Sequence, residues 1–531
     1  MRFPLFDHDH IQIKIDEPPS RSYLVGLFII LLWTATFRAA TLDLPFHYGS
    51  PESSGSFYGV LARNYLGLKW NETYGMPALT VGHSPNAGVT VYHDHPPVVP
   101  LLILPFYKFF GVGEWQTRLA TSIATLATLL ALYGLLDQFA SRRVALLSAA
   151  CLAATPMTLY YGGQPEVLGM PLILFVICSV YAYFVFHRNP NVRTSALLIA
   201  TFALAGATDW PAFILVPIFL IHFVTTQPSR QWVWIFMFCV VGAALFFLLY
   251  AYIKVAADLP WSWMVDPFLK RSALGRNLGF SPAEWFAVAL SYNVTFHTVP
   301  LLLLATAWLI GLSWRSQSLG NKVPRILLVW GVAHVLLGRE GTYTHDWWWW
   351  PLTPGLATAA GFSLDWLVRQ TQRSLNLIAS NAIFASALFV FAVWTTQSTY
   401  AKLHPDNARP FTAEELGEAI RAAAPNPDDV ALLVWNNNSQ DFFYGNRPLR
   451  TGIWSVDDLQ HRLCSHTVDL PFGYEQMWNA PAKGIVFPLV FLQDYHEILD
   501  YLQLHYTEVS LKRELITKFR VFRFCNCTNR T

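Results

Sequence analysis

The sequence predicts an α-helical polytopic membrane protein with about eleven transmembrane helices and a small α/β domain outside the membrane. Hydrophobic residues make up 53% of its 531 residues and charged residues only 13%, a balance that few water-soluble folds tolerate. Apolar runs of about 17–25 residues recur along the chain, each long enough to cross a bilayer. The net charge of +2 points to no nucleic-acid partner.

The short connections between the apolar runs set the expected orientation. The spans are expected over 22–41, 116–137, 143–161, 167–186, 194–208, 211–226, 231–253, 296–313, 323–338, 347–367 and 376–395. Basic side chains fall in alternate connections, at Arg142 and Arg143, Arg188 and Arg193, Arg230, Arg315 to Arg325, and Arg369 and Arg373. By the positive-inside rule these connections face the cytoplasm, so we expect the N-terminus inside and the C-terminus outside.

This topology divides the chain into three parts. They are a cytoplasmic tail over 1–21, a transmembrane body over 22–395 with a first exterior loop over 42–115, and an extracytoplasmic α/β domain over 396–531. Residues 1–20 are polar and no cleavage site follows the first apolar run, so that run is expected to be an uncleaved anchor. The longest polar segments all lie outside the membrane, whereas a carrier would place polar groups at mid-membrane. The layout favours an enzyme working at the outer membrane surface.

Two segments of the first exterior loop have a clear local pattern. Ser56–Leu68 is amphipathic and predicts a helix. Pro96–Phe110 is apolar but too short and too rich in proline for a confident span, so we expect it to lie in the membrane interface or to dip partway in.

The tail alternates between helix and strand signals. Thr412 begins a capping box with Glu415, which predicts a helix start. Strands are expected over 429–435, 484–492 and 519–524, with a helix over 497–504, and this alternation predicts the α/β domain. A disulfide from Cys464 to Cys525 or Cys527 is left open.

Candidate catalytic groups gather in the first exterior loop. Glu52 precedes the amphipathic helix, whose N-terminus would lower the pKa of this carboxyl group and keep it ionised; simple capping of the helix is the other interpretation. Arg63, Asp94 and His95 follow in the same loop. His95 stands before two prolines and could instead cap the interfacial segment. Asp43 is a further acid of this loop.

Two more acids lie at later membrane boundaries. Glu166 opens a transmembrane helix, where a carboxylate is either a helix cap or faces a cavity, because burial in hydrocarbon is costly. Asp209 stands between two closely spaced spans, and a role in a tight turn is expected there.

A late exterior loop carries cationic and aromatic residues. Arg339 and His345 lie between two predicted spans, and Trp347–Trp350 follow. The four tryptophans predict an interfacial aromatic belt, and Arg339 could either snorkel to the interface or bind a lipid phosphate with its planar guanidinium group.

This layout resembles the membrane glycosyltransferases of the GT-C superfamily, in particular protein O-mannosyltransferases and lipid A aminoarabinose transferases. The features that carry it, over about Tyr23–Thr395, are Glu52 followed by SFYGVLARNYLGLKW, His95–Pro97, FGVGEWQTRLATSIATLATLLALYGLL at 110–136, Glu166, and His345 with Pro351 and Pro354. The family commonly has Asp, often Asp-Glu, where this chain has Pro51-Glu52-Ser53-Ser54, and often Lys or Arg in the late loop.

The resemblance implies inverting transfer of a hexosyl or pentosyl group from a polyprenyl-phosphate-sugar donor to an acceptor hydroxyl. Glu52 would be the base, with Asp43 and Asp94 as alternatives, and Glu166 would orient the acceptor or the base. The donor phosphate would be held by Arg339 and His345, with Arg63 and His95 in reserve; Asp94 is expected to contact substrate. Some superfamily members use a divalent cation held by loop acids, and that stays open.

Two rival interpretations remain at this stage. A transporter predicts broken helices, internal repeats and ionisable residues at mid-span. A non-catalytic scaffold would keep the fold without needing Glu52. The acceptor could be a lipid, a glycan or a protein. The short cytoplasmic tail without a retention signal makes a bacterial inner membrane the expected setting, with the site facing the periplasm or exterior.

Overall fold

The computed structural model describes most of the chain. The described residues are 21–48, 52–81, 88–272, 279–313, 318–375, 377–404, 411–434, 438–463, 465, 467–471, 475–477, 480, 482–491 and 494–524. At Glu52, Leu377, Glu475 and Met477 the description covers the backbone alone. The cysteines of the predicted disulfide, Cys464, Cys525 and Cys527, lie outside the described residues.

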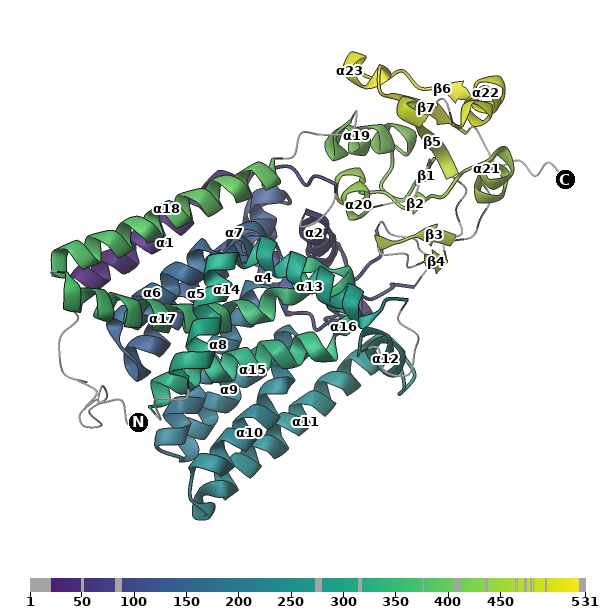
Figure 1. Ribbon diagram of the computed structural model, residues 1–531. Coiled ribbons are helices and arrows are strands. Elements are labelled where there is room, and N and C mark those ends of the chain that lie inside the picture. Colours follow the sequence, from purple (N-terminus) through teal and green to yellow (C-terminus); the bar gives the residue numbers. More distant parts are fainter. Residues whose placement is uncertain are drawn as a thin grey trace.

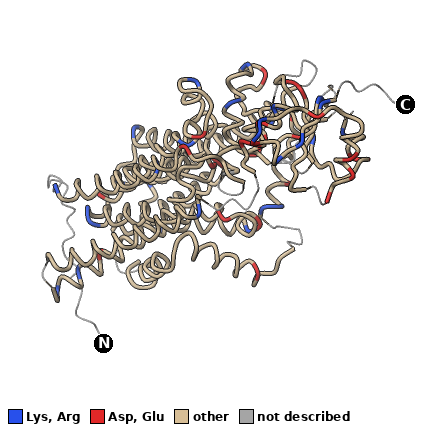
Figure 2. Tube along the Cα trace, turned by 90° about the horizontal axis from the view of Figure 1, so that it is seen from above, with Lys and Arg blue, Asp and Glu red and all other residues tan. Residues whose placement is uncertain are grey.

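Helices build a large body that precedes a smaller C-terminal part (Figure 1). The helices are α1 Arg21–Thr41, α2 Glu52–Gly67, α3 Trp70–Thr73, α4 Val98–Phe110, α5 Glu114–Phe139, α6 Arg142–Ala154, α7 Pro156–Tyr161, α8 Met170–Arg188, α9 Val192–Thr208, η1 Trp210–Ile214, α10 Leu215–Thr226, η2 Ser229–Gln231, α11 Trp232–Ala256, α12 Val265–Ser272, α13 Pro282–Phe296, α14 Val299–Ala307, η3 Trp308–Leu312, α15 Leu319–Leu337, α16 Arg339–Thr344, η4 Asp346–Leu352, α17 Thr353–Ser374 and α18 Leu377–Leu403. Figure 2 shows charged residues mainly at helix ends and in the C-terminal part.

Several of these helices could cross a membrane. Five described helices are long and apolar enough, namely Arg21–Thr41, Glu114–Phe139, Met170–Arg188, Ser229–Ala256 and Ile378–Leu403. A sixth span results if α13 and the segment Val299–Leu312, which meet at an angle of 103°, count as one. Val98–Phe110, Val192–Thr208 and Trp210–Thr226 are shorter apolar helices. The expected number of eleven spans is therefore not established by helix length and composition.

Two breaks separate consecutive helices of the body, and a proline explains the first of them. The span predicted over 143–161 breaks between α6 and α7 at Thr155, which is extended because the residue before a proline avoids the helical region. The sharp bend between α13 and α14 falls at Thr298, whose φ is 68°, just before Val299 and Pro300. The break at Thr155 interrupts the predicted span over 143–161, whereas the bend at Thr298 lies at the start of the span predicted over 296–313.

The C-terminal part contains a mixed seven-stranded sheet of order β4-β3-β2-β1-β5-β7-β6. Its strands are β1 Val430–Leu433, β2 Leu449–Arg450, β3 Thr467–Asp469, β4 Glu475–Met477, β5 Ala482–Pro488, β6 Thr507–Glu508 and β7 Phe519–Arg523. The accompanying helices are α19 Ala413–Ala423, α20 Ser439–Gly445, α21 Val456–Leu463, η6 Leu489–Phe491, α22 His496–His505 and α23 Arg513–Ile516. Central β1 is parallel to β2 and β5, and the other pairs are antiparallel.

Helices and strands here follow the local sequence pattern. Thr412 and Glu415 form the reciprocal capping box that predicts the start of α19. The three strands expected from apolar runs correspond to β1, β5 and β7, whose central positions are buried.

Helix α2 joins the two parts of the molecule. Phe57, Tyr58 and Leu61 belong to the core of the helical body, whereas Val60 belongs to the core of the C-terminal part. The helix packs on α4 and α5 on one side and on α20 on the other. The predicted amphipathic helix is thus buried between two protein surfaces, because its polar side meets the C-terminal part instead of water.

The crossing of α6 and α17 depends on a glycine. A Cβ atom at Gly361 would lie 2.0 Å from Ser148 Oγ and 2.8 Å from its backbone nitrogen. Gly361→Val should therefore lower the melting temperature of the purified protein, since overpacking costs about 1–3 kcal/mol. Gly134→Val is the matched control, because a Cβ atom at this helical glycine meets nothing within 4 Å. Equal melting temperatures of the two variants would contradict this prediction.

Candidate active site

The carboxyl group of Glu166 is buried beside the start of α2. It lies in the connection between α7 and α8 and is 5% exposed. Ser54 Oγ donates to Glu166 Oε2 at 2.6 Å, and the Val167 backbone N–H donates to Oε1 at 2.9 Å. Burial raises the pKa of Glu166, and the hydrogen bond from Ser54 and the charge of His95 oppose this. Glu166 therefore contacts Ser54, which follows Glu52 by two positions in α2. The structure describes only the backbone of Glu52.

His95 and Asp209 form a second buried pair close to Glu166. His95 Nδ1 and Asp209 Oδ1 are 2.7 Å apart, and Asp209 is only 1% exposed. Burial favours the neutral form of His95, but the charge and hydrogen bond of Asp209, together with Asp94 and Glu166, raise the His95 pKa above 6.5. The pairing with Asp209 therefore favours the protonated, cationic form of His95.

Tyr58 of α2 lies within electrostatic range of Glu166, Asp209 and Asp94, so these groups form one cluster. Its side chain is 4% exposed, and burial first, then the charges of Glu166, Asp209 and Asp94, raise the Tyr58 pKa well above its usual value. These electrostatic interactions join α2, the connection before α4, the α7–α8 connection and the end of α9. The hydroxyl stays protonated and can donate a hydrogen bond into the cluster.

The C-terminal part contacts the same end of α2. Ser439 Oγ donates to the Ser53 backbone oxygen at 2.9 Å, and Gln440 Nε2 donates to His47 O at 2.7 Å and to Ser53 Oγ at 3.2 Å. Gln440 is fully buried. Helix α20 thus holds His47, which precedes Glu52 in the sequence, and Ser53, which follows it, while Ser54 is bonded to Glu166.

The connection between α15 and α17 forms, together with Arg271 of α12, a neighbouring aromatic and ionic group. The rings of His345 and Trp347 stack with centroids 4.3 Å apart, and Arg271 pairs with Glu340 at 2.6 Å. Burial, with the charge of Arg271, lowers the pKa of His345 to about 4, so His345 is neutral near pH 7.

His334 connects this group to the acid cluster. Its ring stacks on Trp348, with centroids 5.3 Å apart, and it lies within electrostatic range of Asp209. Trp350 also bridges the two regions, because it contacts Tyr161 and lies beside Gly169 of the Glu166 connection. Arg339 makes one long contact, from Nη2 to Ser272 O at 3.5 Å.

The other candidates from the sequence lie at the margins of the cluster. Arg63 donates from Nη1 to Phe443 O at 2.9 Å and from Nη2 to Phe442 O at 3.1 Å, so its guanidinium group is engaged with α20. The Asp94 side chain is 44% exposed, with His93 Nε2 at 3.7 Å. Asp43 is exposed and acts on Glu414 of α19.

The sequence predicts a turn role for Asp209 and contains no signal that singles out Tyr58. The turn role is real, because Asp209 accepts the Trp210 backbone N–H at 2.9 Å at the start of η1, but the same oxygen pairs with His95. The signal in the sequence for the pairing of Asp209 is its position at an apolar membrane boundary, because a carboxyl group buried there needs a partner. Across the part of the chain that is described, no three His, Cys, Asp or Glu side chains are grouped so as to hold a metal ion.

Comparisons with known proteins agree with this fold. The family model of dolichyl-phosphate-mannose-protein mannosyltransferases matches residues 94–255, the stretch that carries Asp94, His95, Glu166 and Asp209. The structure is similar to ArnT from Cupriavidus metallidurans in the apo state, with 13% identity, a TM-score of 0.64 and coverage of 95% of this chain and 98% of that chain. The same protein bound to undecaprenyl phosphate gives 14% identity, a TM-score of 0.61 and the same coverage, 95% and 98%.

A third solved structure has the same fold with a lower TM-score. The Archaeoglobus fulgidus oligosaccharyltransferase in the apo form is 13% identical, with a TM-score of 0.56 and coverage of 92% of this chain and 73% of that chain. The comparison with curated protein sequences gave no match. The predicted resemblance to the GT-C superfamily is confirmed, and the chain is a largely helical, multi-pass membrane protein with that fold.

The His95–Asp209 pair predicts a pH-dependent stability difference. Because the folded state raises the His95 pKa, the charged pair stabilises the protein fully below the ordinary pKa of 6.5, and this contribution is lost as pH rises through the folded-state pKa. Asp209→Asn should therefore lower the melting temperature more at about pH 6 than at about pH 9, because the contribution of the charged pair decreases as the pH rises above 6.5. A deficit that is the same at both pH values would show that the pair is not charged.

Proposed function

We propose that this protein is an inverting glycosyltransferase that moves a sugar from a polyprenyl-phosphate donor to an acceptor hydroxyl at the outer membrane–water interface. The observation that carries the proposal is the buried cluster of Glu166, His95 and Asp209 against the start of α2. Its three residues lie within the stretch that matches the mannosyltransferase family model. Support for a lipid-linked donor comes from the similar ArnT structure bound to undecaprenyl phosphate.

The proposed step needs one base and several phosphate ligands. The acceptor oxygen attacks the anomeric carbon, the bond from that carbon to the phosphate oxygen breaks, and the electron pair leaves with the polyprenyl phosphate. Glu52 takes the hydroxyl proton, while Glu166 orients the start of α2 through Ser54. Attack opposite the leaving group inverts the configuration of the sugar.

Cationic and neutral donors would stabilise the departing phosphate. His95 is suited to this role because Asp209 favours its protonated form. Arg339 would contribute charge, whereas His345, neutral near pH 7, would contribute a hydrogen bond. Arg63 is proposed to hold α2 against α20 instead of binding substrate, and Asp94 to contact the sugar at the exposed edge.

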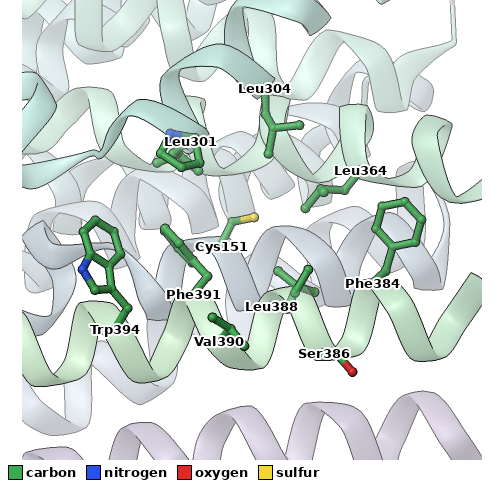
Figure 3. A pocket seen from close by; sticks show the side chains of 12 residues that line it. Cys151, Leu301, Leu304, Leu364, Phe384, Ser386, Leu388, Val390, Phe391 and Trp394 are labelled. Atoms are coloured by element: carbon green, nitrogen blue, oxygen red, sulfur yellow. The ribbon is translucent and has the colours of Figure 1, made fainter.

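An apolar groove offers room for the lipid part of the donor. A cavity of about 590 Å³ lies among α6, α14, α17 and α18. Figure 3 shows Leu301, Leu304, Phe384, Leu388, Phe391 and Trp394 around it. These side chains match the chemistry of a prenyl chain, whose burial is favourable in proportion to the apolar area removed from water.

The proposal includes the wider arrangement of the chain. Eleven spans over 22–395 would place the site and the domain over 396–531 outside a bacterial inner membrane. In this arrangement the C-terminal domain holds the residues that flank Glu52 through Ser439 and Gln440. The transferred sugar is a hexose or pentose, and the acceptor a lipid, glycan or protein hydroxyl.

Glu52→Gln should abolish transfer while leaving the protein folded. Removing a general base lowers turnover by about 10²–10⁴-fold. The measurement uses purified protein with a panel of radiolabelled polyprenyl-phosphate sugars and a membrane extract as acceptor. Glu497→Gln, a change of an exposed acid on α22, is the control and should retain full activity.

Each other outcome of this assay has a distinct meaning. Transfer that survives in Glu52→Gln but is lost in Asp43→Asn, Asp94→Asn or Glu166→Gln would move the base to that residue. Absence of transfer by the wild type from every donor, in an extract that supports a related enzyme, would refute the enzyme and favour a scaffold or a transporter.

Glu166 and Ser54 should act as one unit. Ser54→Ala and Glu166→Gln are each expected to lower kcat about tenfold, because each weakens a charge-assisted hydrogen bond. Since both changes remove the same interaction, the double variant should be little worse than either single variant. Fully additive losses would exclude a shared positioning role, as would losses confined to KM.

A further inference from the structure

The C-terminal end of α18 places a lysine beyond the apolar groove. On this helix Phe384, Leu388, Phe391 and Trp394 line the groove (Figure 3). Lys402 follows Trp394 by eight residues, which is about 12 Å along the helix axis. It is turned by only about 20° from Phe391 around the axis, so it lies on the face of α18 that lines the groove. A long side chain on a helix points back toward the N-terminus, and this direction leads from Lys402 toward the groove.

The ammonium group of Lys402 reaches the bend between α13 and α14. Lys402 Nζ lies 5.4 Å from the centroid of the Phe296 ring. Phe296 is the last residue of α13 and is only 6% exposed. Pro300 and Leu301, at the start of α14, line the groove. Helices α18 and α13 therefore bring the ammonium group close to the groove from two sides.

The ammonium group of Lys402 makes neither a hydrogen bond nor an ion pair within the described part of the chain. Asp346 lies within electrostatic range, but its Oδ1 accepts a hydrogen bond from the Tyr161 hydroxyl at 2.6 Å. A lysine near a helix end ordinarily extends to the membrane surface. Here the side chain lies instead against a buried ring of another helix, where an anionic head group can pair with it.

We propose that Lys402 binds the phosphate of the polyprenyl phosphate whose chain occupies the groove. This role rests on the proposed function and adds to it a phosphate ligand outside the candidate active site. The Phe296 ring lies 5.7 Å from the ring of Tyr161, which precedes Glu166 by five residues. The Tyr161 hydroxyl is bonded to the residue after His345. A phosphate at Lys402 therefore lies between the groove that takes the prenyl chain and the segments that carry Glu166 and His345.

A comparison of two lipids tests the role of Lys402. The purified full-length protein is titrated, in native mass spectrometry, with a short polyprenyl phosphate and with the polyprenol of the same chain length. We expect the phosphate lipid to bind about tenfold more tightly, because only this lipid makes a hydrogen bond between charged groups. Equal binding of the two lipids by the wild type would overturn the proposal.

Lys402→Met removes the charge and keeps most of the apolar stem. This variant should bind the two lipids equally, with its affinity for the polyprenol unchanged. Lys108→Met, which changes an exposed lysine of α4, is the control and should keep the preference of the wild type. A preference that survives in Lys402→Met, or that is lost equally in both variants, would overturn the role of Lys402.

A second pair of variants tests the groove as the place of the prenyl chain. Ala387→Trp puts a large ring at an exposed position that lines the groove, and it should weaken binding of both lipids about tenfold because the ring takes the space of the chain. Ala385→Trp adds the same ring at an exposed position of α18 that does not line the groove, and both affinities should stay unchanged. Equal effects of the two changes would overturn the groove as the place of the chain.

Binding and turnover together distinguish this phosphate site from the proposed reaction. A protein that transfers sugar but shows no lipid preference dependent on Lys402 would overturn the phosphate site alone. A protein that shows this preference but transfers no sugar would support the phosphate site and refute the transferase.

Discussion

The hydrogen bonds that fix the N-terminal end of α2 are the constraint on which the rest of the site depends. Ser54, near the beginning of this helix, donates to the buried carboxyl group of Glu166 in the helical body. Ser53 is bonded to Ser439 and Gln440 of the C-terminal part. A helix start is ordinarily free to fray, because its first N–H groups have no partner within the helix. Here two separate parts of the fold fix its position.

Burial of acids near the membrane would be unfavourable without this arrangement. Glu166 and Asp209 are 5% and 1% exposed. Glu166 accepts hydrogen bonds from the Ser54 hydroxyl and from the Val167 backbone N–H. Asp209 accepts one from the Trp210 backbone N–H and pairs with His95. A buried carboxylate is tolerated when such partners offset its lost hydration. The same burial makes each remaining charge act strongly on its neighbours, which explains how Asp209 favours the protonated form of His95.

The sequence predicted those features that arise from nearby residues. The capping box at Thr412 and Glu415 and the strands β1, β5 and β7 each depend on a few neighbouring positions. Glu166 and His95 could be selected as candidates because polar residues at a membrane boundary need a reason to be there. The apolar pattern could not show that Thr155 interrupts the span predicted over 143–161, because a break in the backbone does not change hydropathy.

Roles that depend on distant partners were beyond the sequence pattern. Asp209 is 114 positions from His95, and Arg63 is 380 positions from Phe443, so neither pairing has a local signature. Arg63 shows the consequence most clearly, because a cation in a loop of acids suggests a phosphate ligand until its guanidinium group is seen to bond main-chain oxygens of α20. That bond gives the C-terminal part a direct hold on the helix that begins at Glu52. A C-terminal part joined to α2 in this way can influence the proposed base without touching substrate, since any shift of α20 must move Ser53 and Arg63 together.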